Sequence, residues 1–254
     1  MVFIWINEET IMKCLILAAG YATRLYPLTE NFPKPLLEVG DKTILDWLID
    51  DMATTGLIDE YIVISNHKFA HIFEEWAAKH TAVTIRVVDD GTTNNENRLG
   101  AVRDIQFAID QLQLDDDLLV MAGDNLLDFS MAEFIRYAHD KQATCVMSYY
   151  EGDAAKLRKS GVAELDADRR ILSMEEKPAE PKSTWCIPAF YCYTREDSKL
   201  IAKGIENGCG VDAPGSFIAW LCKQTAVYAW EMPGKRYDIG NLESYEEVKR
   251  TYGK

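Results

Sequence analysis

Short apolar runs alternate with amphipathic stretches through the first 150 residues of the chain. The strand-like runs are residues 13–19, 61–65, 83–88, 118–122 and 143–149. The stretches with apolar positions at helical spacing are residues 43–54, 69–79, 99–112 and 131–141. Buried strands that alternate with helices predict a mostly parallel twisted sheet with helices on both faces, which is a Rossmann-like α/β fold.

The pattern changes beyond about residue 150. Short strand-like segments follow one another with few helices between them, at residues 161–166, 170–175 and 185–193. They predict a small antiparallel lobe beside the main sheet. The later segments are helical at residues 196–206, 217–223 and 242–251, with a strand at 227–230. We find no repeat and no linker, so we predict a single domain with two parts.

Charge and cysteine usage exclude several classes of protein. The formal net charge is −14, which disfavours non-specific binding of nucleic acid because such binding needs Lys and Arg to neutralise phosphates. No apolar run is long enough to cross a bilayer. None of the six cysteines forms a Cys-x-x-Cys pair, which is typical of reduced, buried thiols. We therefore expect a cytoplasmic protein with no nucleic-acid partner and no membrane partner.

The first strand-like run ends in a loop suited to holding phosphate. Small side chains at its end let backbone N–H groups approach an anion, and a hydroxyl follows; these candidates for nucleotide binding are Ala18, Ala19, Gly20 and Thr23. Arg24 can fork onto a phosphate, and Lys34 is a compact charge held between Pro33 and Pro35. The loop lacks the Gly-x-Gly-x-x-Gly and Gly-Lys-Ser/Thr patterns, so it is neither a dinucleotide-binding turn nor a P-loop.

An aspartate closes another strand-like run, in Ala122-Gly123-Asp124. A carboxylate at the end of a buried strand is costly unless it binds something, and Mg²⁺ with substrate phosphates is a natural partner. Ligands of open α/β sheets bind beyond the carboxyl ends of the strands. We therefore expect Asp124 and the loop at residues 20–24 to face one crevice.

These blocks, in this order, resemble the sugar-1-phosphate nucleotidyltransferases of the glucose-1-phosphate thymidylyltransferase type. The resemblance covers the chain from residue 13 to the C-terminal helix. It implies a single in-line displacement in which a sugar 1-phosphate attacks the α-phosphorus of an NTP and pyrophosphate leaves. Arg24 and Lys34 would neutralise the phosphates of the NTP, while Asp124 and Asp238 would hold Mg²⁺.

The resemblance also assigns the two substrate pockets. Lys177 matches the lysine that meets the sugar phosphate, and Glu176 the glutamate that accepts from sugar hydroxyls. The other acceptor and base positions that match the family are Gly161, Ile187, Asn95 and Gly100. Residues 13–150 would then bind the nucleotide, residues 151–235 mainly the acceptor, and residues 236–254 would supply the second metal aspartate and the last helix. Residues 1–12 are either an N-terminal extension or the product of an upstream start codon.

The chain departs from the family pattern at two places. Ala22 stands where the family carries a second glycine, and Pro188-Ala189 replaces a glycine near the acceptor site. The base and the sugar stay open. The family often assembles as homo-oligomers, but no interface is evident in the sequence.

Two alternatives compete with this interpretation. A phosphocholine-type cytidylyltransferase would keep the fold and need an aromatic cage, which Trp185, Tyr191 and Tyr193 could form. A non-catalytic nucleotide-sugar sensor would keep the pocket without the chemistry. Glu176 and Lys177 suit a sugar phosphate better than choline, and the sensor is disfavoured because the candidate catalytic charges are present.

Overall fold

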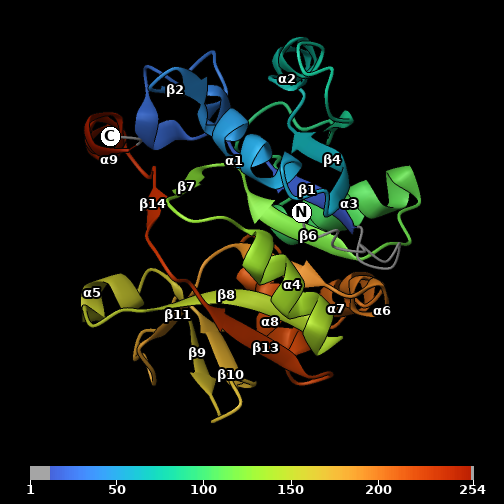
Figure 1. Cartoon of the computed structure of the whole chain (residues 1–254), viewed down its shortest axis with the longest axis vertical. Coiled ribbons are helices and arrows are strands. Elements are labelled where there is room, and N and C mark those ends of the chain that lie inside the picture. The colour runs from blue at the N-terminus through green and yellow to red at the C-terminus, as the bar shows by residue number, and fades with distance from the viewer. Residues whose placement is uncertain (1–11, 253–254) are drawn as a thin grey trace, which may run out of the picture.

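The computed structural model describes residues 12–252, so the predicted extension at 1–11 lies outside the described residues, while Met12 begins the first strand. A ten-stranded sheet follows the order β10-β9-β11-β8-β12-β6-β1-β4-β5, and β13 pairs with β8 (Figure 1). Its strands are β1 (Met12–Leu17), β4 (Ile58–Ser65), β5 (Ile85–Asp89), β6 (Leu118–Ala122), β8 (Thr144–Tyr150), β9 (Gly161–Leu165), β10 (Ile171–Glu176), β11 (Trp185–Ile187), β12 (Phe190–Tyr193) and β13 (Val227–Glu231).

Strands β6, β1, β4 and β5 form the parallel centre of the sheet. Successive side chains of β1 point to opposite faces, so Cys14 and Ile16 enter one core cluster and Leu15 enters the other. All three are fully buried. Burial on both faces explains why this strand is a continuous apolar run in the sequence rather than an alternating one.

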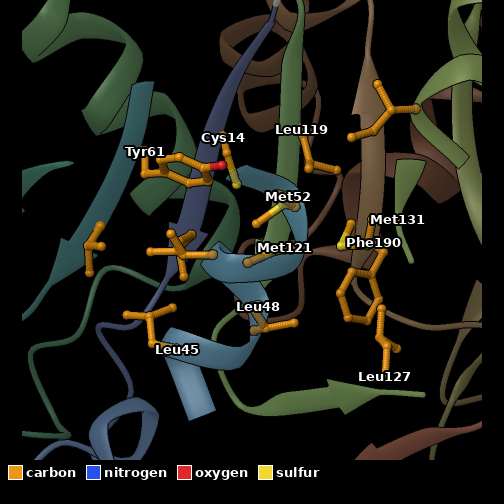
Figure 2. Close-up of a cluster of buried hydrophobic side chains, with 14 of the residues drawn as sticks. Cys14, Leu45, Leu48, Met52, Tyr61, Leu119, Met121, Leu127, Met131 and Phe190 are labelled. Atoms are coloured by element: carbon orange, nitrogen blue, oxygen red, sulfur yellow. The ribbon is translucent and has the colours of Figure 1, made fainter. Parts of the chain in front are cut away.

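Helices cover both faces of the sheet, as predicted. Their bounds are α1 (Ile44–Ala53), α2 (Ala70–Ala77), α3 (Ala101–Leu112), α4 (Ala132–Lys141), α5 (Ala154–Leu157), α6 (Arg195–Ser198), α7 (Ile201–Glu206), α8 (Gly215–Leu221) and α9 (Leu242–Thr251). Helices α1, α2 and α4 share one apolar cluster with the strands, part of which is shown in Figure 2, where Leu45, Leu48 and Met52 of α1 face the sheet. Helices α3, α7 and α8 pack on the other face.

The antiparallel strands extend the main sheet. β12 lies between β6 and β8 and is antiparallel to both, and β11 and β9 continue the same sheet beyond β8. Pro188 and Ala189 separate β11 from β12. The helical pattern at 196–206 is divided into α6 and α7, where Leu200 takes the N-cap position of the second helix.

A small ribbon joins the two parts of the chain. β7 (Asn125–Leu127) pairs antiparallel with β14 (Arg236–Asp238), and β14 leads directly into α9 (Figure 1). An apolar cluster that includes Leu25, Ile239 and Tyr245 packs this region against the loop after β1. The phosphate loop and the end of β14 are therefore fixed to each other by a shared core. The pair β2 (Glu38–Val39) and β3 (Lys42–Thr43) precedes α1.

Between residues 12 and 252, none of the helices combines the length and the apolar character that crossing a membrane requires.

Candidate active site

The loop after β1 has a defined backbone although Ala22 replaces the family glycine. Ala22 adopts a left-handed conformation, with φ of 46°, and a short 3-10 turn (Thr23–Leu25) follows. The Thr29 hydroxyl donates to the Ala22 carbonyl at 2.8 Å, and the buried Asn66 amide donates to the Ala19 carbonyl at 3.0 Å. These two hydrogen bonds and the buried Leu25 hold the loop in a conformation that alanine adopts at some cost.

The loop and Asp124 line one crevice, as the sheet-edge argument predicted. The crevice has a volume of about 230 Å³. Its lining includes Ala18, Gly20, Ala22, Arg24, Lys34, Asp124 and Gly240. The Arg24 side chain is exposed, and among residues 12–252 it has no ion-pair partner. A guanidinium free at the rim of a small-residue loop can receive phosphate without breaking an existing bond.

The Lys34 ammonium, predicted to bind phosphate, already has a partner within the protein. Its side chain is buried, with 7% of the residue exposed, and its Nζ lies 2.7 Å from Oδ2 of Asp124. Oδ1 of Asp124 accepts from the Asn125 amide at 2.6 Å. Asn125 in turn accepts from Arg236 at 2.5 Å. A continuous chain of polar contacts therefore runs from Lys34 through Asp124 and Asn125 to Arg236.

Asp238 is brought to the same place by strand pairing. It stands opposite Asn125 in the β7–β14 ribbon, and the Ile239 amide donates to the Asp124 carbonyl at 3.3 Å. Both carboxylates are solvent-accessible, with side-chain exposures of 37% for Asp124 and 55% for Asp238. Within 12–252 no group of three or more His, Cys, Asp and Glu side chains forms a metal cage. Two accessible carboxylates on neighbouring strands, without a cage, suit Mg²⁺, which completes its coordination with water and substrate phosphate.

The predicted acceptor residues converge through strand register. Gly161 of β9 pairs with Glu176 of β10 on one side and Ile187 of β11 on the other. A Cβ on Gly161 would come within 2.9 Å of the Glu176 carboxylate, so glycine keeps this surface open. Burial raises the pKa of Glu176, and the neighbouring Lys177 ammonium partly offsets the shift.

Lys177 leaves β10 in a left-handed conformation, with φ of 50°. Its backbone amide donates to the Ser160 carbonyl at 3.0 Å, and its side chain is exposed. This turn places the lysine beside the Ser160–Gly161 segment. Glu176 is therefore half-buried, whereas the neighbouring Lys177 side chain is exposed.

The candidate base-reading loop is anchored to a distant segment. Gly100 has φ of 91°, and a Cβ there would lie 2.6 Å from the Val211 carbonyl oxygen, so only glycine fits. Arg98 donates from two nitrogens to Oδ1 of Asp212, at 2.7 and 3.1 Å, which ties the loop to the segment before α8. Asn95 stays exposed next to this anchor.

Two side chains near the crevice were missed by the sequence analysis. Asn125, which is 3% exposed, and Arg236 connect the candidate metal carboxylates to the acceptor side. Both directly neighbour predicted motifs, at Asp124 and Asp238. That adjacency was the available signal, but only the β7–β14 pairing shows that they contact each other.

The aromatic cage that the choline alternative requires does not form. Tyr191 and Tyr193 are each 1% exposed and pack in the core with Phe217. Trp185 instead lies over the guanidinium of Arg169 at 4.1 Å. Both tyrosines are buried because β12 is an internal strand of the sheet, and its alternate side chains, which point to the same face, pack in the core.

Comparison with known proteins agrees with this geometry. The model of the nucleotidyl transferase family matches residues 13–254. The chain belongs to this family. A glucose-1-phosphate adenylyltransferase from Fervidobacterium nodosum is 26% identical over 248 residues, which cover 92% of this chain and 59% of the relative. The chain thus spans about three fifths of that relative's length.

Solved structures of nucleotidyl transferases share the fold. A UDP-glucose pyrophosphorylase complexed with UDP-glucose is 20% identical with a TM-score of 0.79, covering 95% of this chain and 98% of its own. A UTP-bound UGPase from Acinetobacter baumannii is 20% identical with a TM-score of 0.78, and the match covers 96% of this chain and 93% of that structure's chain. The mixed sheet, its helices and its antiparallel extension are therefore those of the nucleotide-sugar transferase fold.

Proposed function

We propose that this chain transfers a nucleotidyl group from an NTP to a sugar 1-phosphate, which yields an NDP-sugar and pyrophosphate. The observation that carries this proposal is that Arg24, Lys34 and Asp124 line one crevice, while β14 places Asp238 opposite Asn125, the chain neighbour of Asp124. Membership of the nucleotidyl transferase family supports it, as do relatives named for glucose 1-phosphate, UDP-glucose and UTP.

The chemistry needs positioning and charge stabilisation, with no covalent enzyme intermediate. An oxygen of the acceptor phosphate forms a bond to the α-phosphorus, and the bond between that phosphorus and the bridging oxygen of the β-phosphate breaks. Arg24 would neutralise the departing pyrophosphate from the exposed rim of the loop. Backbone N–H groups of the loop at Ala19 and Gly20, with the Thr23 hydroxyl, would hold the phosphates at close range.

Asp124 and Asp238 would hold Mg²⁺, whose charge would offset that of the phosphates. Besides neutralising the phosphates of the NTP, Lys34 would neutralise Asp124 before the substrates bind. Asn125 and Arg236 would keep the two carboxylates in register from the acceptor side.

The acceptor would lie against Gly161 and Ile187, with Glu176 accepting from its hydroxyls and Lys177 directing its phosphate. Asn95 and Gly100 would face the base, since the loop that carries them is fixed by Arg98 and Asp212. The six free thiols, of which five are buried, suit a reducing, cytoplasmic setting for this reaction.

The decisive test is pyrophosphate release in the presence of Mg²⁺. Five NTPs (dTTP, UTP, CTP, GTP and ATP) are crossed with a panel of sugar 1-phosphates and phosphocholine. Release with one NTP and one sugar phosphate, abolished by EDTA, is the expected result. Release with CTP and phosphocholine alone would move the chain to the choline branch, and NTP binding without release from any pair would favour the sensor.

A further inference from the structure

A second pocket meets the nucleotide crevice at the end of β14. Its volume is about 580 Å³. Asp238 lines this pocket and Gly240 lines the nucleotide crevice, so the two cavities adjoin across residues 238–240. The pocket is built from the end of β8, the turn before β9 and the connection from β13 to β14; its lining includes Tyr149, Tyr150, Glu151, Lys156, Lys159, Ser160, Lys235, Arg236, Tyr237 and Asp238.

Cations outnumber carboxylates in this pocket although the whole chain is strongly acidic. Lys156 pairs with Glu151 at 3.6 Å, and Arg236 lies 3.8 Å from Asp238. Lys159 and Lys235 are exposed and have no ion-pair partner within the described part of the chain. Like charges gathered around one cavity repel each other, and an anion bound between them removes that cost.

The pocket is also connected to the reacting centre. Arg236 donates to Asn125, which donates to Asp124, and the same guanidinium lies over the Tyr149 ring at 5.6 Å. Ser160 lines the pocket and accepts the backbone hydrogen bond of Lys177. The residue assigned to the attacking phosphate therefore lies beside the pocket, while Lys159 and Lys235 are left for something else.

We propose that this pocket binds a second anionic group of the acceptor, so that the acceptor is a phosphate monoester that also carries a carboxylate or a second phosphate. The proposal rests on the proposed nucleotidyl transfer and names the class of its substrate. Lys159 and Lys235 supply the charge, and the hydroxyls of Tyr149 and Tyr237 are available as hydrogen-bond donors. The same charges oppose a quaternary ammonium group, which needs a neutral or acidic aromatic cage.

The test compares acceptors that differ only in the extra anion. Pyrophosphate release is measured for glucose 1-phosphate against glucuronic acid 1-phosphate, and for glucose 1-phosphate against glucose 1,6-bisphosphate, with phosphocholine alongside. The member with the second anion is expected to have a kcat/KM at least about tenfold higher. The carboxylate and phosphate arms separate the two sources of charge.

Variants then locate the preference in the pocket. In the double variant Lys159→Gln/Lys235→Gln, the ratio of kcat/KM between charged and neutral acceptors should fall toward one, mainly through a higher KM for the charged member. The matched control is Lys79→Gln/Lys203→Gln, which removes two exposed lysines outside the pocket and should keep the ratio. Raising the salt from about 50 to about 200 mM should also reduce the ratio, because partly exposed charges are screened.

The two proposals fail in different ways. Suppose that pyrophosphate is released, but the neutral and the charged acceptor have equal kcat/KM, or phosphocholine is the preferred acceptor. The second-anion inference is then wrong and nucleotidyl transfer stands. If no pair releases pyrophosphate, nucleotidyl transfer to these acceptors is wrong, and calorimetric binding decides the inference. Equal affinity for charged and neutral members, or a difference that survives Lys159→Gln/Lys235→Gln, overturns it.

Discussion

The crevice after β1, proposed to bind the nucleotide, and the pocket of Lys159 and Lys235, proposed to bind a second anion, lie at opposite ends of residues 238–240. They are built from different kinds of groups. The crevice consists largely of backbone and small side chains from the loop after β1, with Arg24, Lys34 and Asp124 as its charges. The pocket consists of long lysine, arginine and tyrosine side chains from segments far apart in the chain. A site made of backbone fixes a ligand common to all NTPs, whereas a site made of side chains can discriminate between acceptors.

The largest expected effect concerns Asp124, which lines the crevice after β1. If this carboxylate is dispensable for activity, the contrast between the two sites is wrong. Asp124→Asn should lower kcat/KM by a factor on the order of 100 or more, because it would remove the proposed metal ligand and the charge that Lys34 neutralises. Steady-state pyrophosphate release measures the effect. Asp140→Asn, an exposed carboxylate on α4, should leave the rate unchanged. A rate for Asp124→Asn within a few-fold of the parent would contradict the assignment.

Arg24→Ala tests the crevice without disturbing its core. We expect turnover to fall by a factor on the order of 100, since the guanidinium would stabilise charge on the leaving pyrophosphate. The melting temperature should stay the same, because Arg24 is exposed and has no ion-pair partner within residues 12–252. Turnover and thermal unfolding are measured on one preparation. A large drop in melting temperature with normal turnover would mean that the arginine is structural.

Two glycine substitutions should have different effects, one on stability and one on acceptor binding, because the added Cβ would contact different groups. Gly100→Ala presses on the Val211 carbonyl at 2.6 Å with a positive φ, so the free energy of unfolding should fall by about 1–3 kcal/mol. Gly161→Ala meets the Met174 methyl at 2.6 Å and the Glu176 carboxylate at 2.9 Å. The flexible Met174 can move, so the main effect should be an acceptor KM raised by about tenfold.

Urea unfolding and separate KM values for NTP and acceptor distinguish these outcomes. Gly152→Ala is the control, since its Cβ would make only ordinary contacts at 3.7 Å. If Gly161→Ala raised the KM of the NTP instead of the acceptor, the assignment of Gly161 to the acceptor site would be wrong.

The last prediction concerns the pH dependence of stability rather than turnover, and it involves Asp104 on helix α3. Burial raises the pKa of Asp104 to about 7, and the Asp90 carboxylate adds to the shift. Because the folded-state pKa lies above the unfolded value near 4, this group contributes most to stability at low pH, and that contribution is lost as the pH rises through 7. Asp104→Asn stays neutral and should therefore stabilise the protein at pH 8, by up to about 4 kcal/mol.

Urea unfolding at pH 5 and pH 8 checks this sign. The advantage of Asp104→Asn should be clearly larger at pH 8, whereas Asp110→Asn, an exposed position on the same helix, should show no such difference. An advantage that is equal at the two pH values would show that Asp104 does not titrate between them.

Local patterns were sufficient for the sheet centre and the phosphate loop. The apolar run at residues 13–19 predicted a buried strand, which the structure has at Met12–Leu17, and the strand ends at Gly20 and Gly123-Asp124 predicted a shared crevice. Each of these statements depends on neighbours in sequence or on the rule that parallel strands end at one edge. The roles assigned to the site residues remain predictions.

Other features depended on contacts between distant segments. Under the choline alternative Tyr191 and Tyr193 could have formed an aromatic cage, but their strand β12 is internal to the sheet and both side chains are buried. Arg98 and Asp212, which lie far apart in the sequence, form an ion pair. The pairing of Lys34 with Asp124 was likewise not visible, because each had been interpreted separately.

By itself the sequence determined the α/β class, the order of the elements and the residues that form the phosphate loop, because periodicity and turn chemistry act over a few residues. Tertiary structure alone decided that β14 pairs with β7, that Arg236 meets Asn125, and that Lys159 and Lys235 share a pocket. The physical reason is that hydrophobic patterning says which side chains must be buried. It does not say which of the distant strands will bury them together.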